Sequence, residues 1–554
     1  MPPPPRQPLL LIGLLCALAL GASLHNSLVW SSRRLVQANP AAASLRAAVA
    51  SFAPARWRAS SAGLKEAYRP VANLSFALDN ALWRGRPAGY HLANLCWHVL
   101  AVAALFLLAY WVLVDFRVAR PVAGAWFAAA AFALHPALVE AAVWVENRGV
   151  LICALLCFAA YAQLLAVWRG RVGRLGYVGA GVAYAAALVT HEAAVALPIT
   201  LALHAALRPD ASGRNKRLAQ TAPFFVAAAA FTVLRLSWLK TGAVLVGDTP
   251  DIPWAHRALA VVRTVGGYMQ TLLLPVGLCA DRYFVIPRGL RYPGMWGASA
   301  TLVAWAACLA WASRRRRLVT LGLLALAAAL LPVSNLVLIP GRPMADQRLY
   351  LPALGLCLVG GAAFARARRH TAALLVALLC TLAALATTRC FDFADDYAFW
   401  REAMREAPRK SRVMMNLAIH CRDRLWVDRA EKLFGRVVRL YPTRAEARHQ
   451  LGKIMLYRKL PEQALDYFAS AHRLSPAPSA ELCVDTAVAL VGLERYPDAL
   501  AYAQQAKALP NAPSVVWRLA SDIHRKLGQS AQADADARQA QRRAQAEAAA
   551  GAAP

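Results

Sequence analysis

Long runs of apolar residues, separated by short polar segments, fill most of the first 388 positions of the chain. The clearest runs cover residues 9–22, 99–114, 122–134 and 150–167. With their flanking residues, most are long enough to cross a hydrocarbon core of about 30 Å as an α-helix. Taken with the later runs, the pattern predicts an all-α, polytopic membrane helix bundle of about eleven spans. Because so many runs follow the first, we interpret it as an uncleaved helix rather than a signal peptide.

Three polar interruptions modify this pattern. A polar segment, residues 27–88, follows the first run and forms the first outer loop, with short amphipathic pieces at 44–52 and 74–83. Residues 190–192 separate two apolar halves and predict a helical hairpin that turns within the membrane. Residues 258–274 are interrupted by Arg, Gly and Gln, which favours an interfacial or re-entrant helix over a span.

A different pattern begins near position 389, where helical segments become polar and repeat. Two windows align at an offset of 34 positions, and two looser copies follow. The small, aromatic and proline positions of the four copies are, in order, Leu417, Ala430, Phe434, Pro442; Leu451, Ala464, Phe468, Pro476; Ala499, Ala503, Ala506, Pro510; and Trp517, Ala533, Ala537, Ala540. This period predicts a tetratricopeptide-repeat α-solenoid. We therefore divide the chain into a membrane domain (1–388), a linker helix (389–410), repeats (411–543) and a disordered tail (544–554).

Composition and charge agree with a membrane protein and set its orientation. Only 17% of the 554 residues are charged and the mean hydropathy is +0.40, whereas soluble proteins have about 25% charged residues. The net charge of +32 would suggest nucleic acid in a soluble protein, but here much of it lies in short loops, where Arg and Lys mark the cytoplasmic side. These clusters are Arg117, Arg120; Arg169, Arg171, Arg174; Arg208, Arg214, Lys216, Arg217; Arg314, Arg315, Arg316, Arg317; and Arg366, Arg368, Arg369. We expect an inner-membrane protein with a cytoplasmic N-terminus, periplasmic repeats and no nucleic-acid partner.

Cysteine and histidine spacing points to no cofactor. The eleven cysteines include no CxxC pair and no Cys/His metal spacing, and most lie inside apolar runs. We predict no metal site and no disulfide.

Several motifs, taken together and in order, resemble a known family. They are LHNSLVW, YRPVANLSFALDNALW, GYHLANLCWHVL, FALHPALVEAAVWVENRGVL, LVTHEAAVALP, LLPVSNLVLI and MADQRLYLPALGL. The chain resembles membrane glycosyltransferases of the C-type fold that carry tetratricopeptide repeats, which include the transmembrane-and-tetratricopeptide-repeat O-mannosyltransferases and bacterial relatives. The resemblance implies transfer of a sugar from a polyprenyl-phosphate donor to a protein or glycan acceptor on the outer face of the membrane.

Four basic residues are candidates for holding the lipid phosphate of such a donor. Arg69, His91, Arg148 and Arg348 all lie at the outer ends of predicted spans. Arginine at that depth is costly unless it is paired or functional, and its guanidinium suits phosphate. The alternative for each arginine is headgroup contact or a structural ion pair with one of three acids, Glu140, Glu146 or Asp346.

The departure from the family lies in the first outer loop. Relatives have an Asp-Asp pair where this chain has Ser31 and Ser32, followed by Arg33 and Arg34. A serine hydroxyl does not ionise near pH 7, so it replaces a carboxylate neither as a general base nor as a metal ligand.

Acids elsewhere on the same face could take over that role. The catalytic candidates are Glu140, Asp346 and Glu192, and Glu146 lies nearby. For Glu140 and Glu192 the alternative is an ion pair with Arg148 or Arg348.

Three functional hypotheses remain open from the sequence. The first is a glycosyltransferase whose repeats recruit a protein. The second is a catalytically inactive descendant acting as a membrane scaffold through its repeats, which the loss of the acidic pair favours. The third, a transporter, has less support because no paired halves with matching broken helices are evident.

Overall fold

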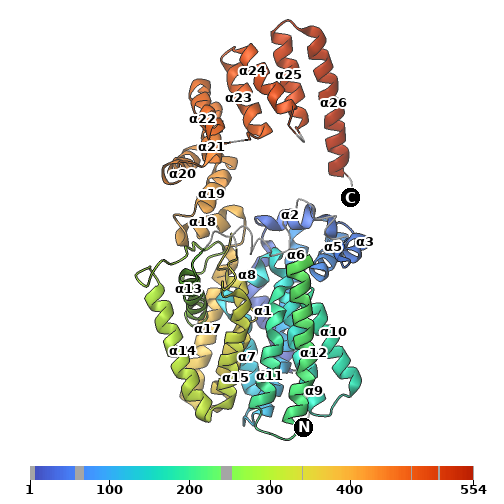
Figure 1. The fold of residues 1–554 in the computed structure, drawn as a ribbon, viewed down its shortest axis with the longest axis vertical. Helices are drawn as coiled ribbons and strands as arrows, with labels where there is room; N and C mark the ends of the chain where they lie inside the picture. Colours follow the sequence, from blue (N-terminus) through green and yellow to red (C-terminus); the bar gives the residue numbers. More distant parts are fainter. Residues whose placement is uncertain are drawn as a thin grey trace. The chain divides into compact units, whose positions relative to one another are not determined.

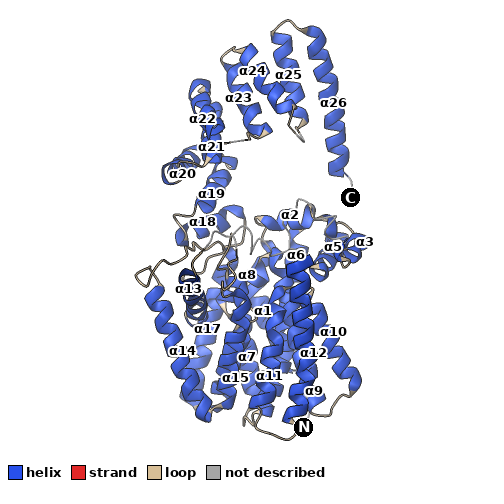
Figure 2. Cartoon of the chain, in the orientation of Figure 1, coloured by secondary structure: helices blue, strands red, loops and turns tan. Residues whose placement is uncertain are grey.

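The structure, a computed structural model, describes residues 7–55, 68–238, 252–339, 341–475, 477–509 and 512–552. All regular secondary structure in these ranges is helical (Figures 1 and 2). The chain divides into two compact units, Met1–Glu406 (unit 1) and Ala407–Pro554 (unit 2). The predicted all-α class is confirmed.

Unit 1 is a bundle of long helices with short helices at one end. The bundle contains α1 (Gln7–Leu20), α6 (Pro87–Asp115), α7 (Pro121–Leu134), α9 (Arg148–Trp168), α10 (Arg174–Leu188), α11 (Leu197–Leu207), α12 (Arg214–Val233), α13 (Trp254–Leu273), α14 (Met295–Arg315), α15 (Arg317–Leu330), α16 (Ala353–Arg366) and α17 (Arg369–Phe391). The short elements are η1 (Gly21–His25), α2 (Ser31–Gln37), η2 (Pro40–Ala42), α3 (Leu45–Ala50), α5 (Pro70–Trp83), α8 (Pro136–Val143), η3 (Val145–Asn147), η4 (Glu192–Ala196), η5 (Leu234–Trp238), η7 (Leu331–Val333), η8 (Asp346–Leu349) and α18 (Asp396–Glu406).

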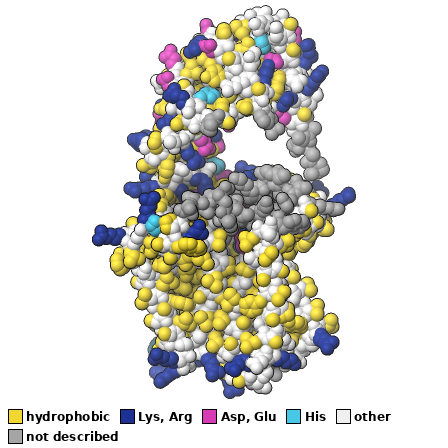
Figure 3. Space-filling model, viewed as in Figure 1, with side chains coloured by type: hydrophobic (Ala, Val, Ile, Leu, Met, Phe, Trp, Pro, Cys, Tyr) yellow, Lys and Arg dark blue, Asp and Glu magenta, His cyan; other side chains and the backbone are white. Residues whose placement is uncertain are grey.

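Several of these helices are long and apolar enough to cross a membrane. Among the described residues, five helices meet that test, and α7 with α8, bent by 65° at their junction, adds a sixth. In the space-filling view, hydrophobic side chains cover a broad band of unit 1 (Figure 3). A multi-pass membrane protein is therefore indicated, but a count of eleven spans is not shown, because α1, α11, α15 and α16 are apolar but shorter.

The basic clusters of the short loops meet at one end of unit 1, which we call the arginine-rich end. Asp115 of α6 receives ion pairs from Arg169 at 2.9 Å and from Arg208 at 3.0 Å. Arg120, before α7, donates its Nε to the carbonyl of Ala365 near the end of α16 at 2.8 Å. The opposite end, called the loop end, carries η1, α2, α5, α8, η4, η8 and α18.

Two interruptions of the apolar pattern shape the loop end. The helix is interrupted at the polar residues before Glu192: α10 ends at Leu188, and η4 and α11 follow. His135 lies between α7 and α8 with an extended backbone, and its Nδ1 accepts the N–H of Ala137 at 3.2 Å. Pro136 then starts α8 at a position where no intrahelical N–H is required. The chain thus turns at both places without leaving the unit.

Glycines allow α16 to pack closely against two helices. A Cβ at Gly124 of α7 would lie 2.7 Å from the carbonyl oxygen of Gly361, and one at Gly322 of α15 would lie 2.7 Å from that of Gly355. Small residues at such crossings are typical of helix pairs in membranes.

Unit 2 contains four helical hairpins. They are α19 (Ser411–Asp423) with α20 (Val427–Leu440), α21 (Ala445–Tyr457) with α22 (Pro461–Leu474), α23 (Ala480–Gly492) with α24 (Tyr496–Lys507), and α25 (Ser514–Lys526) with α26 (Ser530–Ala552). The repeat positions Ala430, Phe434, Ala464 and Phe468 are all buried. The predicted tetratricopeptide-like repeats are confirmed, although Pro476 and Pro510 lie outside the described residues. The Ala-rich α26 reaches Ala552, through most of the predicted tail, consistent with the high helix propensity of alanine.

Replacing Gly452 with alanine should destabilise unit 2. A Cβ at this position would overlap the ring of Phe468, which is fully buried on the facing helix. Overpacking of this kind costs about 1–3 kcal/mol. Gly435, in α20, is the matched control, because a Cβ there meets nothing within 4 Å and alanine favours a helix interior. Hydrogen exchange of α21 and α22 amides in the full chain should accelerate for Gly452→Ala and not for Gly435→Ala; equal protection in both would contradict the prediction.

Candidate functional site

The segment that follows η1 is held at the loop end by an aromatic cluster around Trp30. Trp30 has a positive φ of 47° just before α2, a conformation that costs a non-glycine residue about 1–3 kcal/mol. Its N–H donates to Asp396 Oδ1 at 2.6 Å. Its ring stacks on Trp144 at 5.4 Å and meets Trp400 edge-on at 4.9 Å. These contacts with Trp144, directly after α8, and with α18 offset the strain and fix the position of the next two residues.

Ser31 and Ser32 stand in different environments. The Ser31 hydroxyl donates to the carboxylate of Glu146 in η3. Ser32 is fully buried, and its hydroxyl has no partner among the described residues. Glu146 is partly exposed. A carboxylate from another loop therefore lies directly beside the first of the two serines.

Two arginines contact Glu192 at the same end of the unit, and a third is close to the adjacent His191. Arg69 Nη2 donates to both carboxylate oxygens of Glu192, at 3.2 and 3.3 Å. Arg235, in the π-helical turn η5, pairs with the same carboxylate at 3.3 Å. Arg348 lies within electrostatic reach of the adjacent His191 and donates to the carbonyl of Pro343 at 2.7 Å. We call Arg69, Arg235 and Arg348 the arginine triad; it exceeds the charge of Glu192 by two.

The arginine triad and the Ser31–Glu146 pair are joined by the start of α9. A Cβ at Gly149 would lie 3.7 Å from Cδ of Arg69 and 3.4 Å from the carbonyl oxygen of Thr190. Gly149 is three residues after Glu146, which is about one helical turn, or 5 Å, along the chain. The start of α9, directly after the η3 turn that carries Glu146, therefore packs beside Arg69.

Glu140 is buried beneath the aromatic cluster. Its Oε1 accepts from Arg342 Nη2 at 2.9 Å, while its Oε2 is buried without a hydrogen-bond partner among the described residues. The Arg342 guanidinium also lies 4.8 Å from the Trp144 ring centroid. Glu140 is 1% exposed, so an acceptor could reach it only after rearrangement.

Asp346 is engaged on both oxygens. Arg282 Nη2 donates to Oδ1 at 2.9 Å, and the backbone N–H of Cys279 donates to Oδ2 at 2.9 Å. A cavity of about 500 Å³ opens beside this pair, lined by Arg263, Arg282 and Met344 among others. Asp346 thus fixes the loop that follows α13.

Arg148 forms a structural ion pair. Its side chain is fully buried and pairs with Asp79 of α5 at 2.5 Å. Its Nε donates to Asn94 Oδ1 at 2.7 Å, and the guanidinium lies 4.4 Å from the Phe76 ring. Burial raises the pKa of the Asp79 carboxyl, and the charge of Arg148 opposes that rise in part. Arg148 therefore joins α5, α6 and α9, and its donors are already engaged.

His91 is also placed away from the arginine triad. It is buried, and its Nε2 lies 3.4 Å from the carbonyl oxygen of Ser27 in the first loop. Of the four predicted phosphate ligands, Arg69 contacts Glu192 and Arg348 bonds to the carbonyl of Pro343, whereas His91 and Arg148 have packing roles.

Glu140 and Glu192 form ion pairs with arginines, which is the alternative to a catalytic role, but the arginines are not the expected ones. The predicted partners Arg148 and Arg348 are wrong for Glu140 and Glu192, which pair with Arg342 and with Arg69 and Arg235. Arg235 has a signal of its own in the sequence, because it is a charged residue inside an apolar run, where charge is costly unless it has a role.

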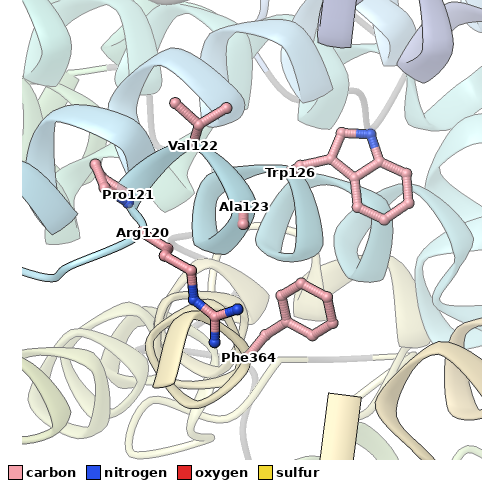
Figure 4. A pocket seen from close by; sticks show the side chains of 6 residues that line it. All are labelled: Arg120, Pro121, Val122, Ala123, Trp126 and Phe364. Carbon is pink, nitrogen blue, oxygen red and sulfur yellow. The ribbon is translucent and has the colours of Figure 1, made fainter. Parts of the chain in front are cut away.

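The described residues include no group of three or more His, Cys, Asp or Glu side chains that could hold a metal ion. A further cavity, about 550 Å³ and lined by Arg120, Val122, Trp126 and Phe364 (Figure 4), lies at the arginine-rich end. It is separated from His135 and the loop end by the length of α7, about 21 Å.

Comparison with known proteins identifies distant relatives. No protein-family model matches the chain. It is 26% identical over 415 residues to the mouse protein O-mannosyl-transferase TMTC4, covering 65% of this chain and 56% of the relative. It is 21% identical over 396 residues to the Caenorhabditis elegans protein O-mannosyl-transferase F38B6.6, covering 69% and 55%. The chain is thus distantly homologous to these transferases over most of its length, and spans slightly more than half of theirs.

Solved structures match the chain in part. MamA from Desulfovibrio magneticus RS-1 covers 27% of this chain and 85% of its own, with 16% identity and a TM-score of 0.25. PilF from Pseudomonas aeruginosa covers 34% and 82%, with 19% identity and a TM-score of 0.24.

Proposed function

We propose that the protein transfers a sugar from a polyprenyl-phosphate donor to a hydroxyl of a protein acceptor, at the loop end of unit 1. Mannose is the sugar named in its relatives. The observation that carries the proposal is the arginine triad, with a net charge of plus two over Glu192, next to the Ser31–Glu146 pair. Under the positive-inside rule the arginine-rich end faces the cytoplasm, so the site faces the periplasm together with the repeats.

Each part of this site has a chemical role. The acceptor oxygen attacks the anomeric carbon, forming the new C–O bond as the C–O bond to the donor phosphate breaks. The acceptor proton passes to the Glu146 carboxylate. The leaving polyprenyl phosphate gains negative charge, which the arginine triad stabilises through charge-assisted hydrogen bonds. Glu146 thereby supplies, from η3, the carboxylate that Ser31 and Ser32 do not.

Arg235→Gln tests the donor site. A hydrogen bond to a charged group contributes about 1.5–3 kcal/mol, so the KM for polyprenyl-phosphate mannose should rise about tenfold or more, with a smaller change in kcat. The assay uses the full chain in detergent with radiolabelled donor and a periplasmic protein extract. Arg288→Gln, an exposed arginine between α13 and α14, is the control and should leave KM unchanged. Equal KM values in the two variants would contradict the donor assignment.

A specific observation also supports an inactive scaffold as the second candidate. Ser32 is fully buried, and its hydroxyl has no partner among the described residues. The position where the relatives have the second acid of the pair therefore lies in the protein interior of this chain. In this case the native chain transfers no sugar from any lipid-linked donor, whereas Ser31→Asp, at the partly exposed first position, gains activity. Transfer by the native chain excludes this candidate.

A further inference from the structure

A second basic site lies at the arginine-rich end of unit 1, away from the proposed transferase site. A cavity of about 690 Å³ opens there, between the α14–α15 turn and the end of α16. Five arginines line it: Arg314, Arg315, Arg316, Arg317 and Arg366. Figure 3 shows Lys and Arg side chains gathered at this end of unit 1.

The turn between α14 and α15 concentrates this charge. α14 ends at Arg315 and α15 begins at Arg317, so Arg316 alone connects the two helices. Its non-helical backbone (φ −131°, ψ 61°) reverses the chain, and its N–H donates to the carbonyl of Ala312 at 2.7 Å. Four consecutive arginines therefore extend from one tight corner.

Within the described part of the chain, no carboxylate neutralises the charge in this cavity. No Asp or Glu lines it, and among the described residues none of the four corner arginines has a carboxylate partner. Two acids adjoin lining residues: Asp115 is already engaged by Arg169, Arg208 and His204, and Asp210 lies 4.0 Å from Arg217. The cavity therefore favours a ligand with more than one negative charge.

The walls of the cavity are those of a membrane interface. Trp311 and Leu318 line it together with the arginines, and Trp311 is 60% exposed. Only 17% of the most apolar stretch of α14 is buried within the protein, so the rest of that helix faces lipid tails. Tryptophan at such a position marks the headgroup level.

We infer that this cavity is a binding site for an anionic phospholipid with two phosphates, such as cardiolipin, whose headgroup meets the five arginines while its chains lie along α14. Basic pockets between membrane helices suit such headgroups. Occupation would join the α14–α15 corner to α16, the helix that packs through glycines on both α7 and α15.

The test compares two triple variants of the full chain by native mass spectrometry with cardiolipin, phosphatidylglycerol and phosphatidylcholine. Arg315→Gln/Arg316→Gln/Arg317→Gln removes three charges from the cavity. Arg174→Gln/Arg214→Gln/Lys216→Gln removes three exposed charges from other loops at the same end. Cardiolipin should bind the native chain more tightly than the other two lipids, and the cavity variant should lose about 10²-fold in affinity, the control about threefold or less.

Several outcomes would overturn the inference. They are equal losses in the two triple variants, no preference for cardiolipin over phosphatidylglycerol, and competition by inorganic phosphate as effective as that by the lipid. If the cavity triple does not fold, Arg315→Gln and Arg214→Gln are compared instead, with the same expected order. The result is independent of sugar transfer, because none of these residues touches the transferase site.

Discussion

Glu146→Gln should lower the rate of sugar transfer by about 10²–10⁴-fold, the usual contribution of a positioned general base. Glutamine keeps an oxygen that accepts the Ser31 hydroxyl, so the hydrogen bond between α2 and η3 survives while the proton acceptor is lost. The measurement is the single-turnover rate with saturating polyprenyl-phosphate mannose, which separates chemistry from donor binding. Asp210→Asn, an acid 51% exposed at the arginine-rich end, is the control and should retain the native rate.

The same assay distinguishes Glu146 from the other acids. Glu140→Gln and Asp346→Asn remove carboxylates that are 1% exposed and hold Arg342 and Arg282. We expect these two to lose thermal stability along with activity, whereas Glu146→Gln keeps its native unfolding temperature. Full activity of Glu146→Gln, with a rate loss confined to Glu140→Gln, would assign the base to Glu140.

Asp79→Ala should destabilise unit 1 by about 3–5 kcal/mol. The Arg148 guanidinium is fully buried, so the substitution leaves a buried charge without its carboxylate partner. The double variant Asp79→Ala/Arg148→Met should recover much of the loss, because removing both charges also removes their desolvation cost. Chemical unfolding of the full chain in detergent, followed by circular dichroism, gives both values.

An exposed ion pair provides the contrast. Arg33 pairs with Asp396 at 3.5 Å and its side chain is 58% exposed, so Arg33→Ala should cost about 1 kcal/mol or less. If Asp79→Ala cost no more than Arg33→Ala, the Arg148–Asp79 pair would not be a structural support.

The sequence predicted elements whose signals are local. The hairpins of unit 2 follow from small and aromatic residues at a fixed period, and Phe434 and Phe468 are buried as expected. The break before Glu192 was visible as polar residues between apolar runs. Each of these depends on residues within one or two helical turns.

The candidate site was predicted less well because its partners are distant in sequence. Arg342 meets Glu140 across 202 positions, and Ser31 meets Glu146 across 115. Periodicity carries no information on such pairs. The sequence therefore named Arg69 and Glu192 separately without indicating that they pair, and it did not indicate Asp79 as the partner of Arg148.

The contacts between the first loop and α18 have a consequence for the order of synthesis. Ser27 bonds to Ala394 across 367 positions, and Trp30 to Asp396 across 366. At about 5–20 residues per second, the loop waits about 20–70 s after its own translation before these partners emerge. Until then Trp30 lacks the bonds that hold its strained backbone, so Ser31 is placed beside Glu146 only when nearly all of unit 1 has been made. A chain interrupted before α18 would have its helices but not its site, whereas one interrupted after Glu406 would have both.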